Sequence, residues 1–121
     1  MDRIGIEAQG FAADITDKIQ LTRAFQDIKS TFGTIDVMEF SPHSGSVPTT
    51  SVLDTTDESA LRIFNNVVIG AINSARQVIP DMTERGEGAL LFTSDLSAMS
   101  PSPMFGNSGI AMSGLRNYMI N

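Results

Sequence analysis

The chain has 121 residues, 41% of them hydrophobic, and its 14 acidic and 8 basic residues give a formal net charge of −6. This composition is typical of one globular domain, residues 1–121. The absence of cysteine excludes disulfides and thiolate metal sites, and the single histidine makes a histidine-based metal site implausible. Magnesium held by carboxylates alone has no motif behind it, so we predict no metal site. The scattered basic residues disfavour nucleic acid as a partner. No apolar run reaches the roughly 18–20 residues that span a bilayer, so we expect no membrane association and a cytoplasmic location.

The first third of the chain predicts a strand, a helix and a second strand. The apolar run at 10–15 is expected to form the first strand, and Thr16 can cap the helix that follows. Gly33 suits the left-handed residue that ends such a helix, and 35–40 follows as the second strand. The helix has one apolar face, made by Leu21, Phe25, Ile28 and Phe32. The Pro- and Ser-rich stretch 41–54 is a loop long enough to carry a function.

A long helix is predicted at 58–79. The residues 55–58, Thr-Thr-Asp-Glu, have the spacing of a capping box, and Pro80 is expected to end the helix. Its apolar residues form two stripes, Leu61, Phe64, Val68, Ala71 and Ala75 on one side and Ile63, Val67 and Gly70 on the other. A helix that is apolar on two sides has to be covered on both, by its own sheet and, as one alternative, by a second subunit.

The last third predicts a turn at 84–88, a third strand at 88–94 and a helix at 105–118. The whole order is therefore β-α-β-α-β-α. Strands that alternate with helices in this way predict an α/β fold with a parallel sheet and right-handed crossovers.

These segments, in this order and spacing, resemble an interior part of the short-chain dehydrogenase/reductase (SDR) family. The residues 13–16, Ala-Asp-Ile-Thr, are similar to the end of the family's third strand, and 34–37, Thr-Ile-Asp-Val, to the entry of the fourth. Gly70 and Pro80 match the spacing of the family's long helix, and 85–94 is similar to its turn and fifth strand. The resemblance implies a partial Rossmann-like, doubly wound parallel sheet that is truncated relative to the family at both ends.

The resemblance also implies NAD or NADP as a cofactor, with Asp14 and Ile15 at the cofactor's adenine, and a small-molecule ligand. The family's catalytic Tyr-x-x-x-Lys pair, in which the ammonium lowers the pKa of the phenol so that it acts as acid and base, falls on Phe105 and Gly109. Of the family's catalytic tetrad only Ser94 is retained.

Other family positions also differ here. Asn66 lies one residue from the family's asparagine position, and Thr93 is an alternative to the retained serine. The glycine-rich turn that holds the cofactor pyrophosphate is missing, and 40–43, Phe-Ser-Pro-His, replaces the family's Asn-Asn-Ala-Gly. Glu39 either has a functional role or lies on a sheet edge in contact with water. In the family two strands separate the segments matched by 10–15 and the next strand, so here they pair directly or a partner chain fills the gap.

The sequence leaves several alternative functions open. The resemblance implies an NAD(P)-dependent oxidoreductase by family that lacks, as this chain, the groups for hydride transfer. The alternative is a non-catalytic module that forms a homo-oligomer through helices 58–79 and 105–118, and a third reading is that the chain is part of a longer protein. A hydrolase built on His43, a neighbouring serine and Asp36 would lack the usual Gly-x-Ser-x-Gly turn. The residues leave the roles of His43 and Asn107 unassigned.

Overall fold

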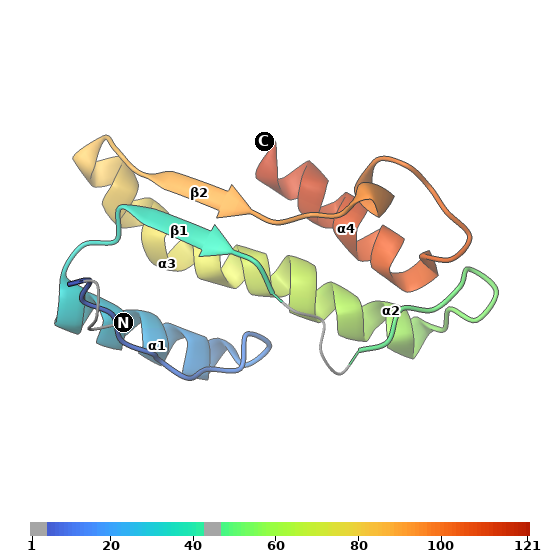
Figure 1. The fold of residues 1–121 in the computed structure, drawn as a ribbon, viewed down its shortest axis with the longest axis horizontal. Coiled ribbons are helices and arrows are strands. Elements are labelled where there is room, and N and C mark those ends of the chain that lie inside the picture. Colours follow the sequence, from blue (N-terminus) through green and yellow to red (C-terminus); the bar gives the residue numbers. More distant parts are fainter. Residues whose placement is uncertain (1–4, 43–46) are drawn as a thin grey trace.

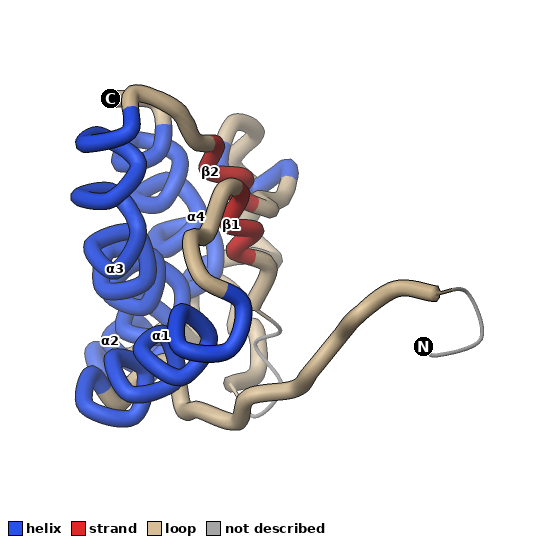
Figure 2. The backbone as a smooth tube through the Cα atoms, turned by 90° about the vertical axis from the view of Figure 1, so that its left-hand side faces the viewer, coloured by secondary structure: helices blue, strands red, loops and turns tan. Residues whose placement is uncertain are grey.

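The computed structural model describes residues 5–42 and 47–121 (Figure 1). The elements along the chain are α1 (Lys18–Phe32), β1 (Val37–Phe40), α2 (Asp57–Phe64), a π-helical turn (Asn65–Ile69), α3 (Gly70–Arg85), β2 (Ala89–Phe92), a 3-10 turn (Leu96–Ala98) and α4 (Gly106–Met119). The helices α1, α2 and α3 lie on one side of the two strands (Figure 2). In the part of the chain described, no helix is long and apolar enough to cross a membrane.

The sheet consists of β1 and β2, which pair in parallel with Val37 opposite Ala89 and Phe40 opposite Phe92. This confirms the α/β class and the parallel pairing of the two strands. The helices cover only one face of the sheet, so that Met38 and Phe40 are buried whereas Val37, Glu39 and Leu91 on the other face are exposed. Glu39 is thus exposed because it lies on the uncovered face of the sheet, and its role stays a prediction.

The strand predicted at 10–15 is wrong. A strand forms only where its backbone N–H and C=O groups pair with a neighbour, and within the described residues β1 pairs with β2 alone. Phe11 packs edge-on against Phe32 of α1, with 6.3 Å between the ring centroids. Ile15 packs against the core beside Gly70, so the segment lies against the helices instead of in the sheet.

The long helix begins one residue earlier than predicted and has a different capping box. The Thr56 hydroxyl accepts a hydrogen bond from the backbone N–H of Ser59 at 3.1 Å, and the Ser59 hydroxyl accepts one from the backbone N–H of Thr56 at 3.0 Å. Serine therefore takes the place expected for an acidic residue, because its hydroxyl also reaches the backbone of the capping residue.

The same helix continues through Pro80 to Arg85, beyond the end predicted at 79. Proline removes one N–H donor from the helix, and the carbonyl that loses this donor belongs to Arg76. Arg76 and Pro80 are both exposed, so water can reach this part of the helix. The helix ends instead at Gly86, whose φ of 75° is left-handed.

Most of both apolar sides of the long helix is covered within this chain. The helix α4 packs along α2 and the π-helical turn, and α1 and β1 pack against α3. An added Cβ at Gly114 of α4 would lie 3.3 Å from the ring of Phe64, so a residue without a side chain permits this close approach. The buried residues of the long helix include Ile63, Val67, Val68, Ala71, Ala75, Val78 and Met82. The two apolar stripes therefore do not by themselves require a second subunit.

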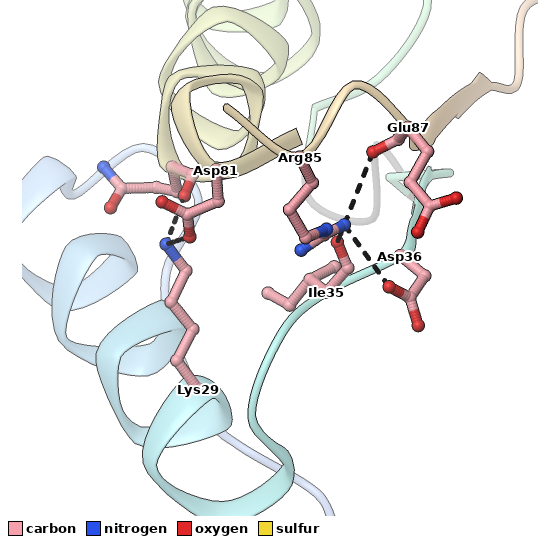
Figure 3. Close-up of polar contacts among 7 residues, drawn as sticks. Lys29, Ile35, Asp36, Asp81, Arg85 and Glu87 are labelled. Atoms are coloured by element: carbon pink, nitrogen blue, oxygen red, sulfur yellow. Dashed lines mark hydrogen bonds and ion pairs between the residues drawn. The ribbon is translucent and has the colours of Figure 1, made fainter. Parts of the chain in front are cut away.

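Two ion pairs attach the helix α3 to its neighbours (Figure 3). The Lys29 ammonium of α1 lies 2.6 Å from a carboxylate oxygen of Asp81 and donates to the carbonyl of Gln77 at 2.7 Å. The Arg85 guanidinium lies 3.3 Å from the carboxylate of Asp36 and donates to the carbonyl of Ile35 at 3.2 Å. The end of α3 thus holds both α1 and the start of β1.

Asp17, and not Thr16, caps α1. Its carboxylate accepts hydrogen bonds from the backbone N–H of Gln20 at 3.1 Å and of Ile19 at 2.9 Å. The backbone hydrogen bond from Gln20 is the largest cause that lowers the pKa of Asp17 from its ordinary value of 3.8. The predicted capping residue Thr16 instead donates to the carboxylate of Asp14.

This cap predicts a pH-dependent stability. Because the pKa of Asp17 is lower in the folded state, its stabilising effect is complete above the ordinary value of 3.8 and is lost as the pH falls through the folded pKa. Asp17→Asn keeps an acceptor oxygen that does not titrate, so its melting temperature will fall less between about pH 5 and about pH 2 than that of the wild type. Asp27→Asn, an equal change at an exposed site within α1, is the control and will follow the wild-type curve.

Candidate functional site

The positions that the resemblance assigns to the family's tyrosine and lysine, Phe105 and Gly109, lie at the start of α4. Phe105 immediately precedes the helix and is 45% exposed, and Gly109 follows one turn later. Both line a hollow of about 270 Å³. The other residues that line it are Val52, Ser97, Pro101, Ser102, Gly106, Ile110 and Ser113. None of the described lining residues is charged, so the hollow offers hydroxyl groups and apolar surface but no acid or base.

Ser94, the retained candidate, follows the end of β2 and is half-buried. Its hydroxyl contacts the sulfur of Met112 at 4.0 Å, and the residue is not part of the hollow that Phe105 and Gly109 line. The alternative, Thr93, is exposed, and its backbone N–H donates to the carbonyl of Phe40 at 2.9 Å, which extends the strand pairing. Ser94 therefore does not share the lining of this hollow with Phe105 and Gly109, and its catalytic role stays a prediction.

Asn107 is a residue whose role the sequence did not reveal. It is fully buried, and its side-chain oxygen accepts from the backbone N–H of Thr50 and of Ser108, both at 2.8 Å. Its side-chain amide donates to the carbonyl of Pro48 at 3.0 Å, and the backbone N–H of Gly106 donates to the carbonyl of Thr50 at 2.8 Å. Asn107 thus holds the long loop after β1 against the start of α4. A polar residue among small residues was the only sequence signal for this role.

The two glycines at the start of α4 differ in what surrounds them. An added Cβ at Gly106 would clash with the hydroxyl of Thr55 and lie 2.7 Å from the carbonyl oxygen of Ser51. At Gly109 the nearest atom to an added Cβ is the Cβ of Ser97 at 3.9 Å, an ordinary contact distance. The loop therefore requires glycine at 106, whereas 109 has room for a side chain.

The predicted cofactor residues line a second hollow of about 510 Å³ at the carboxyl end of β1. The carboxylate of Asp14 accepts from the hydroxyl of Thr16 at 2.7 Å and from its backbone N–H at 2.8 Å, and these bonds lower the pKa of Asp14. Asn66 also lines this hollow. The remaining lining residues are Ala13, Ile15, Leu21, Phe25, Met38, Glu39, Phe40, Ser41, Pro42 and Ser74.

The second hollow does not fit the phosphates of NAD or NADP. Its described lining contains two carboxylates, Asp14 and Glu39, and no Lys, Arg or His. A pyrophosphate is anionic and is normally held by cations or by a helix N-terminus that points at it. The nearby N-terminus of α1 is already occupied by the carboxylate of Asp17. Asp14 and Ile15 as adenine contacts therefore stay a prediction without a phosphate site beside them.

Two further predictions concern metals and hydrolysis. Over residues 5–42 and 47–121 no group of three or more His, Cys, Asp or Glu side chains could hold a metal ion. His43 lies outside the described residues. Asp36, the acid proposed with it, forms its ion pair with Arg85.

A family model described as enoyl-(acyl carrier protein) reductase matches residues 2–119. The chain belongs to the short-chain dehydrogenase/reductase family. A short-chain type dehydrogenase/reductase of Sinorhizobium fredii is 27% identical over 97 residues, which make up 80% of this SDR chain and 38% of that protein. An oxidoreductase of Schizosaccharomyces pombe is 27% identical over 95 residues, 78% of this chain and 36% of the other.

Solved structures share the fold of this SDR chain. An L-sorbose reductase from Gluconobacter frateurii, solved with NADPH and L-sorbose, superposes with a TM-score of 0.84 at 19% identity and covers 97% of this chain and 44% of its own. A short-chain dehydrogenase from Streptomyces avermitilis gives 0.83 at 21% identity, with 97% and 42% covered. The chain thus spans less than half the length of these relatives, and the SDR and Rossmann-like assignments are confirmed.

The contacts of Asn107 predict a large effect of its removal. Asn107→Ala leaves the N–H groups of buried Ser108 and of half-buried Thr50 without their acceptor, at about 1–3 kcal/mol for each such group. The free energy of unfolding measured with urea will therefore fall by at least about 2 kcal/mol. Asn117→Ala, the same change at an exposed position of α4, will leave the unfolding free energy within about 0.5 kcal/mol of wild type. Equal losses in the two variants would contradict this role of Asn107.

The surroundings of the two glycines predict opposite effects. Gly109→Ala will raise the free energy of unfolding by about 0.5–1 kcal/mol, because alanine favours helix and its Cβ meets no close neighbour. Gly106→Ala will lower it by about 1–3 kcal/mol, because the Cβ meets backbone atoms of Ser51 that cannot rotate away. Urea unfolding of both variants measures the two signs, and a stabilised Gly106→Ala variant would show that the loop is not tightly packed there.

Proposed function

We propose that this SDR chain does not transfer hydride by itself and is a non-catalytic member of an oxidoreductase family. The observation that carries the proposal is the uncharged hollow at the start of α4. Phe105 and Gly109 lie there, at the positions that the SDR resemblance assigns to the catalytic tyrosine and lysine. Reduction of a carbonyl requires a proton at the developing alkoxide, and neither residue has a proton to give or a charge that would lower the pKa of a donor.

The surroundings of Ser94 and Asp14 support the same proposal. Ser94 is in contact with the sulfur of Met112, so its hydroxyl is a hydrogen-bond donor without a neighbouring base. The hollow beside Asp14 has two carboxylates and no cation in its described lining, which disfavours a bound dinucleotide. The nicotinamide cofactor of the family would therefore bind this chain only weakly, through adenine contacts at Asp14 and Ile15. The L-sorbose reductase that was solved with NADPH has more than twice the length of chain that matches here.

A second candidate function is helix-mediated self-association. The helices α2 and α4 pack against each other, and each also presents a large apolar residue to solvent. Leu61 of α2 is 60% exposed and Ile110 of α4 is 53% exposed. Small residues beside Ile110, at Gly109 and Ser113, allow a second helix to approach closely. These exposed residues support a homo-oligomer through this pair of helices as the alternative.

The main proposal predicts no cofactor-dependent turnover. Fluorescence titration of the purified chain with NADH or NADPH will not saturate below about millimolar concentration, the weak end of the affinity scale. Assays with ketones and alcohols, L-sorbose among them, will show no oxidation or formation of NAD(P)H above buffer.

Two variants test which feature of this chain prevents catalysis. Phe105→Tyr with Gly109→Lys restores the family's pair, and the Cβ that the lysine adds at 109 meets no atom closer than 3.9 Å. The double variant will fold and stay inactive, because the phosphates of the cofactor still have no cationic partner. Cofactor-dependent turnover in the wild type that is lost in the Ser94→Ala variant would contradict the proposal. Turnover gained only in the double variant would show that the missing pair alone, and not cofactor binding, prevents catalysis.

A further inference from the structure

One edge of β1 carries backbone groups with no partner in the described part of the chain. The N–H of Ala89 donates to the carbonyl of Asp36 at 3.0 Å, and the N–H of Thr93 donates to that of Phe40 at 2.9 Å. The backbone groups of a parallel strand point alternately to its two sides. The N–H and C=O groups of Val37 and Glu39 therefore point away from β2, toward an edge where the described residues supply no strand.

The 510 Å³ hollow lies beside this open edge. Met38, Glu39 and Phe40 of β1 line it, and Ala13 and Ile15 of the N-terminal segment also contribute to its lining. Its wall is mostly apolar, with Leu21 and Phe25 of α1 as further lining residues. A strand placed there would gain backbone hydrogen bonds on one side and bury apolar side chains on the other.

Another segment of the same chain has the residue pattern of a strand but pairs with no other described residue. Every residue from 5 to 10, which we call the N-terminal arm, is exposed, and none of them forms a backbone hydrogen bond with another described residue. The arm leaves the body of the protein as a single length of tube (Figure 2). Ile6 and Ala8 alternate with Glu7 and Gln9, which is the period-two pattern of a strand with one apolar face.

The arm is directed away from the open edge of its own copy. Phe11 is held against Phe32 of α1, and residues 13–15 line the hollow instead of filling it. The arm beyond Phe11 runs outward from the body, where a second molecule can reach it (Figure 2). The five residues that follow the turn at Gly5 would span about 17 Å as a strand, which exceeds the roughly 13 Å of the four-residue β1.

We propose that the N-terminal arm of one copy pairs with the open edge of β1 in a second copy, and that the exchange is reciprocal. Ile6 and Ala8 enter the hollow, and Glu7 and Gln9 lie on the exposed face of the sheet with Glu39. A closed dimer then satisfies both open edges and both arms, which is how two-fold assemblies exchange equivalent segments. This surface is separate from the α2 and α4 residues of the alternative function.

The charges give this dimer a characteristic dependence on salt. Glu7 and Glu39 lie on the same face of the exchanged sheet, and like charges on adjacent strands repel each other. Salt screens such exposed charges, so the dimer will become tighter as the ionic strength rises.

The first test is sedimentation velocity of the full chain over a concentration series into the high-micromolar range. A monomer–dimer equilibrium is expected, and Ile6→Asp will weaken the dimer by at least about tenfold because it places a charge in an apolar hollow. Leu53→Asp, an equal change at a residue that is 96% exposed on another surface, will leave the dimer unchanged. A monomer at all concentrations would overturn the proposal. So would a dimer that survives Ile6→Asp and is lost in Ile110→Asp, which would assign self-association to the helices.

The second test reverses the two charges singly and together. Glu7→Lys and Glu39→Lys will each tighten the dimer several-fold, because each creates an opposite pair across the two strands. The double variant will lose most of the gain, since two lysines then face each other. Gains that simply add in the double variant would mean that only the net charge of −6 matters, and they would overturn the proposed pairing.

Discussion

The continuous helix from Asp57 to Arg85 is the constraint on which the rest of the structure depends. Two parallel strands do not form a stable sheet by themselves, because too little apolar surface is buried between them. Here β1 is held against α3 by small residues, and an added Cβ at Gly70 would lie 3.4 Å from the ring of Phe40. Ala71 and Ala75 are also fully buried. The close approach that these residues permit gives the short sheet its core, and the opposite side of the helix supports α4.

The pattern of apolar residues was enough to predict the helices and the two paired strands, because that pattern reports which face of an element is buried. It was not enough for the segment at 10–15. Its composition is that of a strand, yet a strand also needs a partner, and the choice of partner is a property of the whole fold. Pro80 caused the opposite error, a helix end that was predicted too early. A proline removes one hydrogen bond from a helix, but the helix here continues through it to Arg85.

In the candidate site, too, some features could be predicted from the sequence and others could not. The sequence was enough to predict that Phe105 and Gly109 lie one turn apart at the start of a helix, because two residues four apart share one helix face. The role of Asn107 could not be predicted, because its partners Thr50 and Pro48 are 57 and 59 residues away and lie in a loop without periodicity. Among the described residues no cation lines the hollow beside Asp14, and this too depends on which segments meet at the end of β1.

Among the described residues the sheet has two surfaces without a partner, and each requires a different kind of partner. The outer face presents Val37 and Leu91, which are 56% and 52% exposed, and any apolar surface of sufficient area can cover them. The open edge of β1 presents backbone donors and acceptors in fixed directions, so only a strand with the matching alternation satisfies it. The apolar outer face therefore favours association with any apolar surface, whereas the backbone groups at the open edge of β1 determine the orientation of the partner. This directional surface is a property of the backbone and not of the side chains, so it does not depend on which residues occupy the candidate site.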